Sequence, residues 1–99
     1  MIVGVSVVEI FFPENQSLKD KRQDLRKIVE KTRAKFSISI MEMGQNNLWQ
    51  RAKIAFSIVG INRDHVSATI EKIHDYIESL YIGSIIDTST EIIVMGDEI

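Results

Sequence analysis

The sequence predicts a single α+β domain whose elements follow the order strand, helix, strand, strand, helix, strand. Three observations lead to this fold class. The chain has 99 residues, which is enough for one hydrophobic core. Two segments repeat apolar residues with the period of a helix, and four others have the alternating or continuous apolar character of strands. With 44% apolar and 26% charged residues and one proline, nothing divides residues 1–99 into separate domains.

The first part of the chain predicts a strand and then a long helix. Residues 2–12 are almost continuously apolar and rich in valine, which is typical of a strand in the middle of a sheet. Pro13 ends this strand. Ser17 is the predicted N-cap of the helix, with Asp20 three residues later near the positive end of the helix dipole. The apolar side chains that follow share one arc, so the helix should cover residues 18–35.

The rest of the chain predicts a hairpin, a second helix and a last strand. Apolar and polar residues alternate over 36–40 and again over 52–58, with a segment rich in turn formers between them. Apolar residues over 66–81 recur at spacings of three and four, which predicts an amphipathic helix that ends near Gly83. The β-branched segment 85–95 predicts the last strand.

The order of these elements predicts how they pack. Two right-handed strand–helix–strand crossovers and one hairpin place both helices on the same face of the sheet. The result is a ferredoxin-like sandwich, with a four-stranded antiparallel sheet of order 4-1-3-2 and two helices on one face. The first and third strands are central in this order, and the other face of the sheet should be open.

The residue types that most catalytic and cofactor sites need are scarce in this chain. It has no cysteine, which excludes a disulfide, a thiolate metal site and a thiol nucleophile. His65 and His74 are nine residues apart on the predicted second helix, hence on opposite sides of it, and we expect both on the surface. Neither a glycine-rich phosphate loop nor a nucleophile–base pair is recognisable. We therefore predict a non-enzymatic protein with no cofactor and no metal.

The sequence also bears on where the protein works. No apolar run approaches the roughly 20 residues that span a bilayer. No basic leader precedes the first strand. The expected location is the cytoplasm, with no contact to a membrane.

Charge is distributed unevenly along the chain. Residues 18–35 carry eight basic and three acidic side chains, a local charge of +5, although the whole chain has a formal charge of −2. At 100° per residue, four of the bases share a flank of the helix that contains no acid: Lys19, Arg22, Arg26 and Arg33. Such a flank is typical of a contact with phosphates, and the alternative is a merely solvated helix surface. Lys21 lies beside the apolar arc, so its stem should pack there while its ammonium reaches solvent.

A second candidate contact lies where the third strand begins. Alternation directs Trp49, Arg51 and Lys53 to the open face of the sheet, where the indole could stack on a base while the cations hold phosphate. The alternative is that Trp49 only covers the hairpin and stacks on Arg51. The aromatic motif that RNA-recognition modules of this topology carry on the third strand is absent. Glu42 is expected to face Arg51 across the hairpin as an ion pair.

Two motifs resemble those of the YlxP-like family of small bacterial proteins, which is classed as a domain of unknown function. They are Ser17-Leu18-Lys19-Asp20-Lys21-Arg22 after Pro13, and Leu48-Trp49-Gln50-Arg51-Ala52, with Phe36, Ile38-Ser39-Ile40 and Glu42 between them. The resemblance covers nearly the whole chain. It implies a ferredoxin-like fold and no established enzymatic activity. It also implies association with ribosomal RNA or the ribosome, since such genes often lie among those for transcription elongation, translation initiation and ribosome maturation.

The leading hypothesis is an accessory factor that binds structured RNA or a ribosomal subunit. Lys19, Arg22, Arg26 and Arg33 would meet phosphates, and the cluster around Trp49 would make a second contact. The alternative is a protein-interaction module that uses the open sheet face, including a homodimer. This alternative rests on the first strand, which has apolar side chains on both of its faces. One row of them must therefore lie on the face of the sheet away from the helices.

Overall fold

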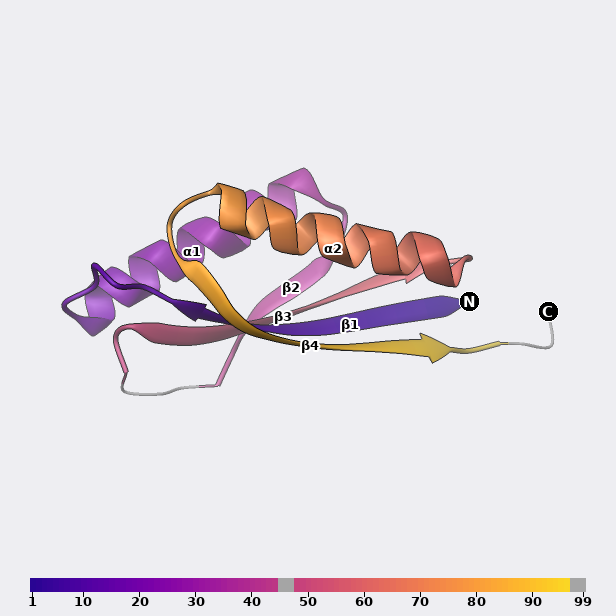
Figure 1. Ribbon diagram of the computed structural model, residues 1–99, viewed down its shortest axis with the longest axis horizontal. Coiled ribbons are helices and arrows are strands. Elements are labelled where there is room, and N and C mark those ends of the chain that lie inside the picture. The colour runs from indigo at the N-terminus through magenta and orange to yellow at the C-terminus, as the bar shows by residue number, and fades with distance from the viewer. Residues whose placement is uncertain (45–47, 97–99) are drawn as a thin grey trace.

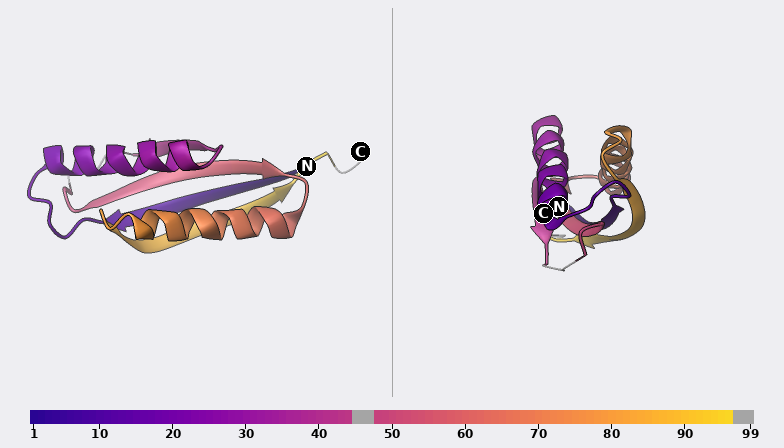
Figure 2. Two further views of the ribbon diagram at one scale, coloured as in Figure 1. Left: turned by 90° about the horizontal axis from the view of Figure 1, so that it is seen from above. Right: turned by 90° about the vertical axis from the view of Figure 1, so that its left-hand side faces the viewer.

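The computed structural model describes residues 1–44 and 48–96, and its elements follow the predicted order (Figure 1). The elements are β1 (Ile2–Phe11), α1 (Leu18–Lys35), β2 (Ser39–Met43), β3 (Arg51–Gly60), α2 (Arg63–Ser79) and β4 (Ser84–Val94). The strands form one antiparallel sheet of order β2-β3-β1-β4, which is the predicted 4-1-3-2 order seen from the other edge. Both helices lie on the same face of this sheet (Figure 2). The predicted ferredoxin-like fold is confirmed.

The hydrophobic core lies between the helices and one face of the sheet. Alternate side chains of the two central strands enter it, among them Ile10 on β1 and Ile54 and Phe56 on β3. Buried side chains at helical spacing, such as Ile28 on α1 and Ile73 on α2, cover these from above. The other parity of each central strand faces away from the helices, as predicted.

The start of α1 follows directly from its cap. The backbone of Ser17 is extended, and its hydroxyl accepts a hydrogen bond of 3.1 Å from the Asp20 amide. That bond satisfies one of the amides that a helix leaves without an internal partner in its first turn. The helix runs to Lys35, as the sequence predicts. The cap of α2, Asn62, accepts from two backbone amides in the same way.

Two predicted boundaries are wrong by a few residues. The second strand begins at Ser39 and not at Phe36, because the Phe36 amide donates to the Thr32 carbonyl and closes α1. The Phe36 ring packs edge-on against Tyr76 of α2, with ring centroids 5.6 Å apart. The third strand begins at Arg51, so Trp49, which the predicted alternation included in this strand, lies in the turn before it.

Gly83 has a different role from the one predicted. The residue that adopts the left-handed conformation after α2 is Tyr81, with φ of 55°. A Cβ atom at Gly83 would lie 2.6 Å from a methyl carbon of Ile10 and 2.8 Å from the ring of Phe12. Glycine is therefore required here because the chain passes close over the core, and not because it ends the helix.

Candidate functional site

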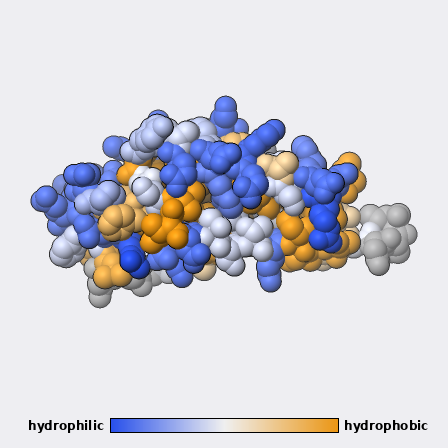
Figure 3. All heavy atoms as spheres, in the orientation of Figure 1, coloured by the Kyte–Doolittle hydropathy of each residue, from blue (hydrophilic) through white to orange (hydrophobic). Residues whose placement is uncertain are grey.

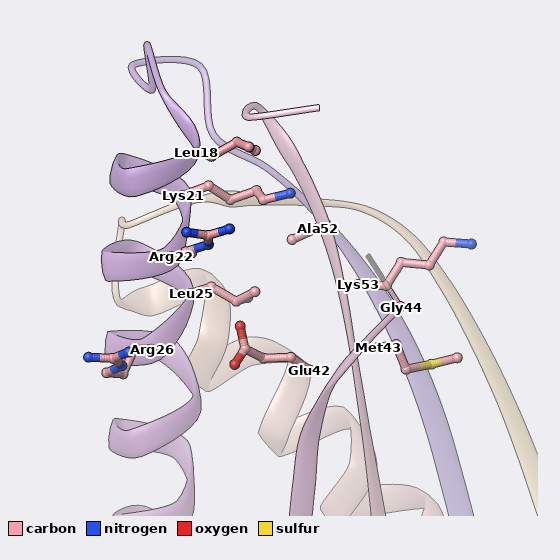
Figure 4. Close-up of a pocket in the computed structure, with 10 residues that line it drawn as sticks. All are labelled: Leu18, Lys21, Arg22, Leu25, Arg26, Glu42, Met43, Gly44, Ala52 and Lys53. Carbon is pink, nitrogen blue, oxygen red and sulfur yellow. The ribbon is translucent and has the colours of Figure 1, made fainter. Parts of the chain in front are cut away.

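The basic flank of α1 lies beside the edge strand β2. Arg33 is held there by a hydrogen bond of 2.9 Å from its Nη2 to the carbonyl oxygen of Ile40. An edge strand has carbonyls that no neighbouring strand pairs, and a guanidinium is a suitable donor to one of them. Arg22 and Arg26, on the same flank toward the start of the helix, line a hollow between α1 and the strands (Figure 4).

This hollow, which we call the α1–β2 groove, has a volume of about 490 Å³. It is lined by Leu18, Lys21, Arg22, Leu25 and Arg26 from α1, Glu42, Met43 and Gly44 at the end of β2, and Ala52 and Lys53 from β3. In Figure 4 the Arg22 guanidinium points from α1 toward the strands, and the Glu42 carboxylate points back toward α1. The Lys53 side chain points away from α1, so its ammonium lies outside the groove.

The prediction that the Lys21 ammonium reaches solvent is wrong. Its side chain is only 8% exposed, and its Nζ donates a hydrogen bond of 2.8 Å to the carbonyl oxygen of Leu48. Burial lowers the pKa of Lys21 below its usual range, the positive charge of Arg22 lowers it further, and the Glu42 carboxylate opposes both. The prediction was wrong because the partner is a carbonyl 27 residues away, which helical spacing does not show.

The two sequence motifs meet at this end of the molecule. The Lys21 ammonium binds the Leu48 carbonyl, and the buried Asn15 amide donates to the Trp49 carbonyl at 3.2 Å. Two further bonds join the same segments, from the Gln50 side chain to the Pro13 carbonyl and from the Phe12 amide to the Gln50 carbonyl. The start of α1 and the segment before β3 are thus tied together, which places Trp49 at the same end of the molecule as Arg22.

The predicted pairing of Glu42 with Arg51 is wrong. Across the hairpin, Glu42 is paired with Ile54, on the sheet face that the helices cover. Arg51 is instead paired with Phe11 of β1, on the open face. Because side chains alternate along a strand, the two residues lie on opposite faces of the sheet. Glu42 therefore contributes an acid to the α1–β2 groove, where its neighbours are basic.

The predicted second contact forms a separate site. Trp49 and Arg51 line a smaller hollow of about 300 Å³ together with Phe11, Leu48 and Gln50. The Trp49 side chain is 48% exposed. Arg51 and Lys53 are exposed on the open face, as the alternation predicts.

The four predicted cations of α1 are placed differently from one another. Arg22 and Arg26 line the same groove, and Arg33 is held further along the same flank. Lys19 is exposed on the first turn of α1, outside both hollows.

A serine–histidine pair, which the sequence did not reveal, lies between the sheet and α2. Ser6 Oγ and His74 Nε2 are hydrogen-bonded at 2.8 Å, and the Thr90 hydroxyl donates to Ser6 at 3.3 Å. The prediction of a surface position is wrong for His74, which is half-buried with its ring edge-on to Phe56, whereas His65 is exposed as predicted. Ser6 has no exposed surface, so no substrate reaches its hydroxyl, and the pair reads as a satisfied polar contact in the core.

The half-buried histidine makes stability depend on pH. Burial lowers the pKa of His74 below its usual value of 6.5, against the raising influence of Glu71 and Asp75. The unfolded chain then takes up this proton at a higher pH than the folded chain does. We expect the contribution of His74 to be complete above about pH 6.5 and to be lost as pH falls through the lowered pKa.

Urea unfolding of the wild type and of His74→Gln at pH 7.5 and pH 5.5 measures this contribution. The variant should be less stable than the wild type at pH 7.5, and the gap between them should narrow at pH 5.5. An equal gap at both pH values would contradict the assignment.

Two further observations concern metal ligands and membrane-spanning helices. Within residues 1–44 and 48–96, no three His, Cys, Asp or Glu side chains gather in a way that could hold a metal ion. In the same part of the chain no helix is long and apolar enough to cross a membrane.

Comparison with solved structures shows the fold. The Arabidopsis thaliana protein At3g17210 aligns with a TM-score of 0.55 and 13% identity, over 95% of both chains. A dimeric ferredoxin-like protein from an uncultured marine organism aligns with a TM-score of 0.51 and 12% identity, over 97% of this chain and 99% of the other. The designed protein Foldit4 gives a TM-score of 0.51 at 11% identity, over 97% and 100% of the two chains. At these identities the likeness concerns architecture alone.

Comparison of sequences shows the family. The uncharacterized protein YlxP of Bacillus subtilis is 28% identical over 78 residues, which are 79% of this chain and 85% of YlxP. The resemblance seen in the two motifs is thereby confirmed. Residues 3–90 match the family described as "Protein of unknown function (DUF503)", and the chain belongs to that family.

Proposed function

We propose that this protein is a non-enzymatic accessory factor that binds structured RNA, such as ribosomal RNA in a ribosomal subunit, through the basic flank of α1. The observation that carries the proposal is the α1–β2 groove, where Arg22 and Arg26 line one wall of a hollow of about 490 Å³. Guanidinium groups present several fixed N–H donors that match phosphate oxygens. In this proposal, successive phosphates of an RNA backbone bind along the groove between α1 and the edge of the sheet.

Arg33 and Lys19 extend this surface in both directions along the helix. Arg33 uses one N–H on the Ile40 carbonyl, and a guanidinium has five. The bond orients the group without neutralising its charge, so it remains available to a phosphate. Lys19 lies on the exposed first turn of α1. The four cations favour recognition of backbone and shape, which is how proteins meet double-stranded RNA.

Of the predicted second contact at Trp49, Arg51 and Lys53, only Trp49 takes part in this proposal. Arg51 and Lys53 lie on the face of the sheet opposite α1. An RNA helix that binds the α1 flank therefore does not reach these two side chains. Trp49 lies at the end of the molecule where α1 begins, and its carbonyl is held by Asn15. An unpaired base next to the bound helix would find the indole there.

The salt dependence of RNA binding tests the proposal. If Lys19, Arg22, Arg26 and Arg33 each meet a phosphate, the plot of log affinity against log salt should have a slope of roughly −3 to −4. Fluorescence anisotropy with a labelled RNA hairpin, at several salt concentrations, gives the slope. Binding through apolar surface would give a slope near zero, because salt screens charges and does not act on area removed from water.

A single substitution then assigns one of the contacts. Arg26→Ala should make the slope shallower by about one unit. The matched control is Lys27→Ala on the opposite flank of α1, which should leave the slope unchanged. If the Arg26→Ala slope equals that of the wild type with affinity intact, Arg26 belongs to a merely solvated surface and the proposal fails at this residue.

A further inference from the structure

The open face of the sheet carries a row of apolar side chains that are only partly buried. Val3, Val5 and Val7 of β1 point away from the helices and are intermediate in exposure. Their cross-strand neighbours include Val59, which is 69% exposed, and Ile93, which is 41% exposed. Because these neighbours share one face of a regular sheet, their side chains form a continuous surface.

This surface extends to the end of the sheet where β1 begins. Met1 and Met95 exchange two backbone hydrogen bonds, from the Met1 amino group to the Met95 carbonyl and from the Met95 amide to the Met1 carbonyl. Both side chains are about half exposed. Figure 3 shows hydrophobic surface gathered at this end of the molecule. Contiguous exposed apolar surface of this kind usually marks an interface.

Charges on the open face are sorted by strand. Lys53 and Arg51 lie on β3, whereas Glu9 lies on β1 and Asp87 and Glu91 lie on β4. Lys53, Glu9 and Asp87 are in register with one another across the three strands. The β3 side of the face is therefore basic and the β4 side acidic, and the apolar side chains lie toward the end of the sheet where β1 begins.

We propose that a second copy of this chain covers the open face, sheet against sheet, with a two-fold axis that runs parallel to the strands between β3 and β1. A rotation about this axis places β3 over the partner's β1 without shifting residues along the strands. Lys53 then lies over the partner's Glu9, and Val59 lies over the partner's Val3. Arg51 lies over the ring of the partner's Phe11, a favourable arrangement for a cation.

The other in-plane axis does not give a complementary interface. A two-fold axis perpendicular to the strands keeps each strand over its own copy and reverses it end to end. Around the central row, this places Glu91 near the partner's Asp87 and Val5 near the partner's Glu9. Like charges would then face each other, and a carboxylate would be buried on an apolar side chain. The sorting of charge by strand thus favours the axis parallel to the strands.

The size of the face also fits a second copy. β1 and β3 have ten residues each and β4 has eleven. At about 3.3 Å per residue and about 4.8 Å between strands, the four-stranded face covers roughly 500–600 Å². Two such faces bury about 1,000–1,200 Å² in total, which reaches the range of specific interfaces. The α1–β2 groove lies on the helix side of the sheet and stays open in this dimer.

Sedimentation equilibrium between about 1 and 100 µM tests the proposal. The wild type should approach twice the chain mass of 11.3 kDa. Lys53→Glu alone and Glu9→Lys alone should each weaken the dimer by about tenfold or more, since two pairs of like charges then meet across the axis. An equimolar mixture of the two variants should dimerise again, because each contact between the different copies joins opposite charges.

The mixture separates the interface from effects within one copy. Lys53 and Glu9 are also neighbours in the same sheet, and mixing leaves those internal pairs unchanged. A further variant, Val59→Lys, should weaken the dimer, whereas Tyr81→Lys, at an even more exposed site off this face, should not. Thermal unfolding confirms that each variant is folded.

Three results would overturn the proposal. The first is a wild type that stays monomeric at 100 µM, which would leave the face to a different protein. The second is single charge variants that dimerise as tightly as the wild type. The third is a mixture that does not regain the dimer.

Discussion

Reversing the charge of both groove arginines, Arg22→Glu with Arg26→Glu, is expected to lower the affinity for structured RNA by about a hundredfold or more at low salt. Two phosphate contacts are lost, and two carboxylates then face the phosphates. Both side chains are exposed at the rim of the α1–β2 groove, so the core is untouched. Anisotropy with a labelled RNA hairpin and co-sedimentation with purified ribosomal subunits measure the loss.

The matched control reverses two lysines on the opposite flank of the same helix. Lys27→Glu with Lys31→Glu changes the net charge by the same amount, and both residues are exposed. A general electrostatic attraction would be weakened equally by either pair. Equal losses for the two double variants would therefore contradict a specific contact at the groove, and so would full binding by the groove variant.

The largest expected effect on stability is that of Phe56→Ala. Phe56 is 2% exposed at the centre of β3, and its ring meets His74 of α2 edge-on. Truncation removes a ring that joins the sheet to a helix and leaves a cavity, which typically costs about 3–5 kcal/mol. Domains of this size are stabilised by about 5–15 kcal/mol in total. Much of the stability of the protein should thus be lost.

Urea unfolding followed by circular dichroism measures this change. Phe56→Leu serves as the control, because it keeps most of the apolar volume and should cost about 1–1.5 kcal/mol. A loss below about 1 kcal/mol for Phe56→Ala would mean that the sheet and α2 do not depend on this ring.

The order of elements was predictable because it depends on local patterns. The continuous apolar run of residues 2–12 marked a central strand, and Ser17 with Asp20 marked the start of α1. Once six elements are known, the handedness of crossovers leaves few arrangements. The grouping of bases on one flank of α1 followed from helical spacing alone, and the structure places Arg22, Arg26 and Arg33 along that flank beside β2.

What the sequence did not reveal depends on partners far apart in the chain. Lys21 is held by the carbonyl of Leu48, and His74 by the hydroxyl of Ser6, 68 residues away. No local spacing encodes such pairs. The pairing of Glu42 depends on the register of the hairpin, and a shift of one residue moves a side chain to the other face. The buried serine in the core row of β1 was the available signal for a polar partner in the core.

If structured RNA binds in the α1–β2 groove, the residues that line the groove should respond to it. Titration of the ¹⁵N-labelled chain with an unlabelled RNA hairpin, followed by amide chemical shifts, locates the binding surface residue by residue. We expect the largest shifts in residues 19–26 of α1 and residues 42–44 at the end of β2. Shifts confined to β1 and β4, or no shifts at saturating RNA, would contradict binding in the α1–β2 groove.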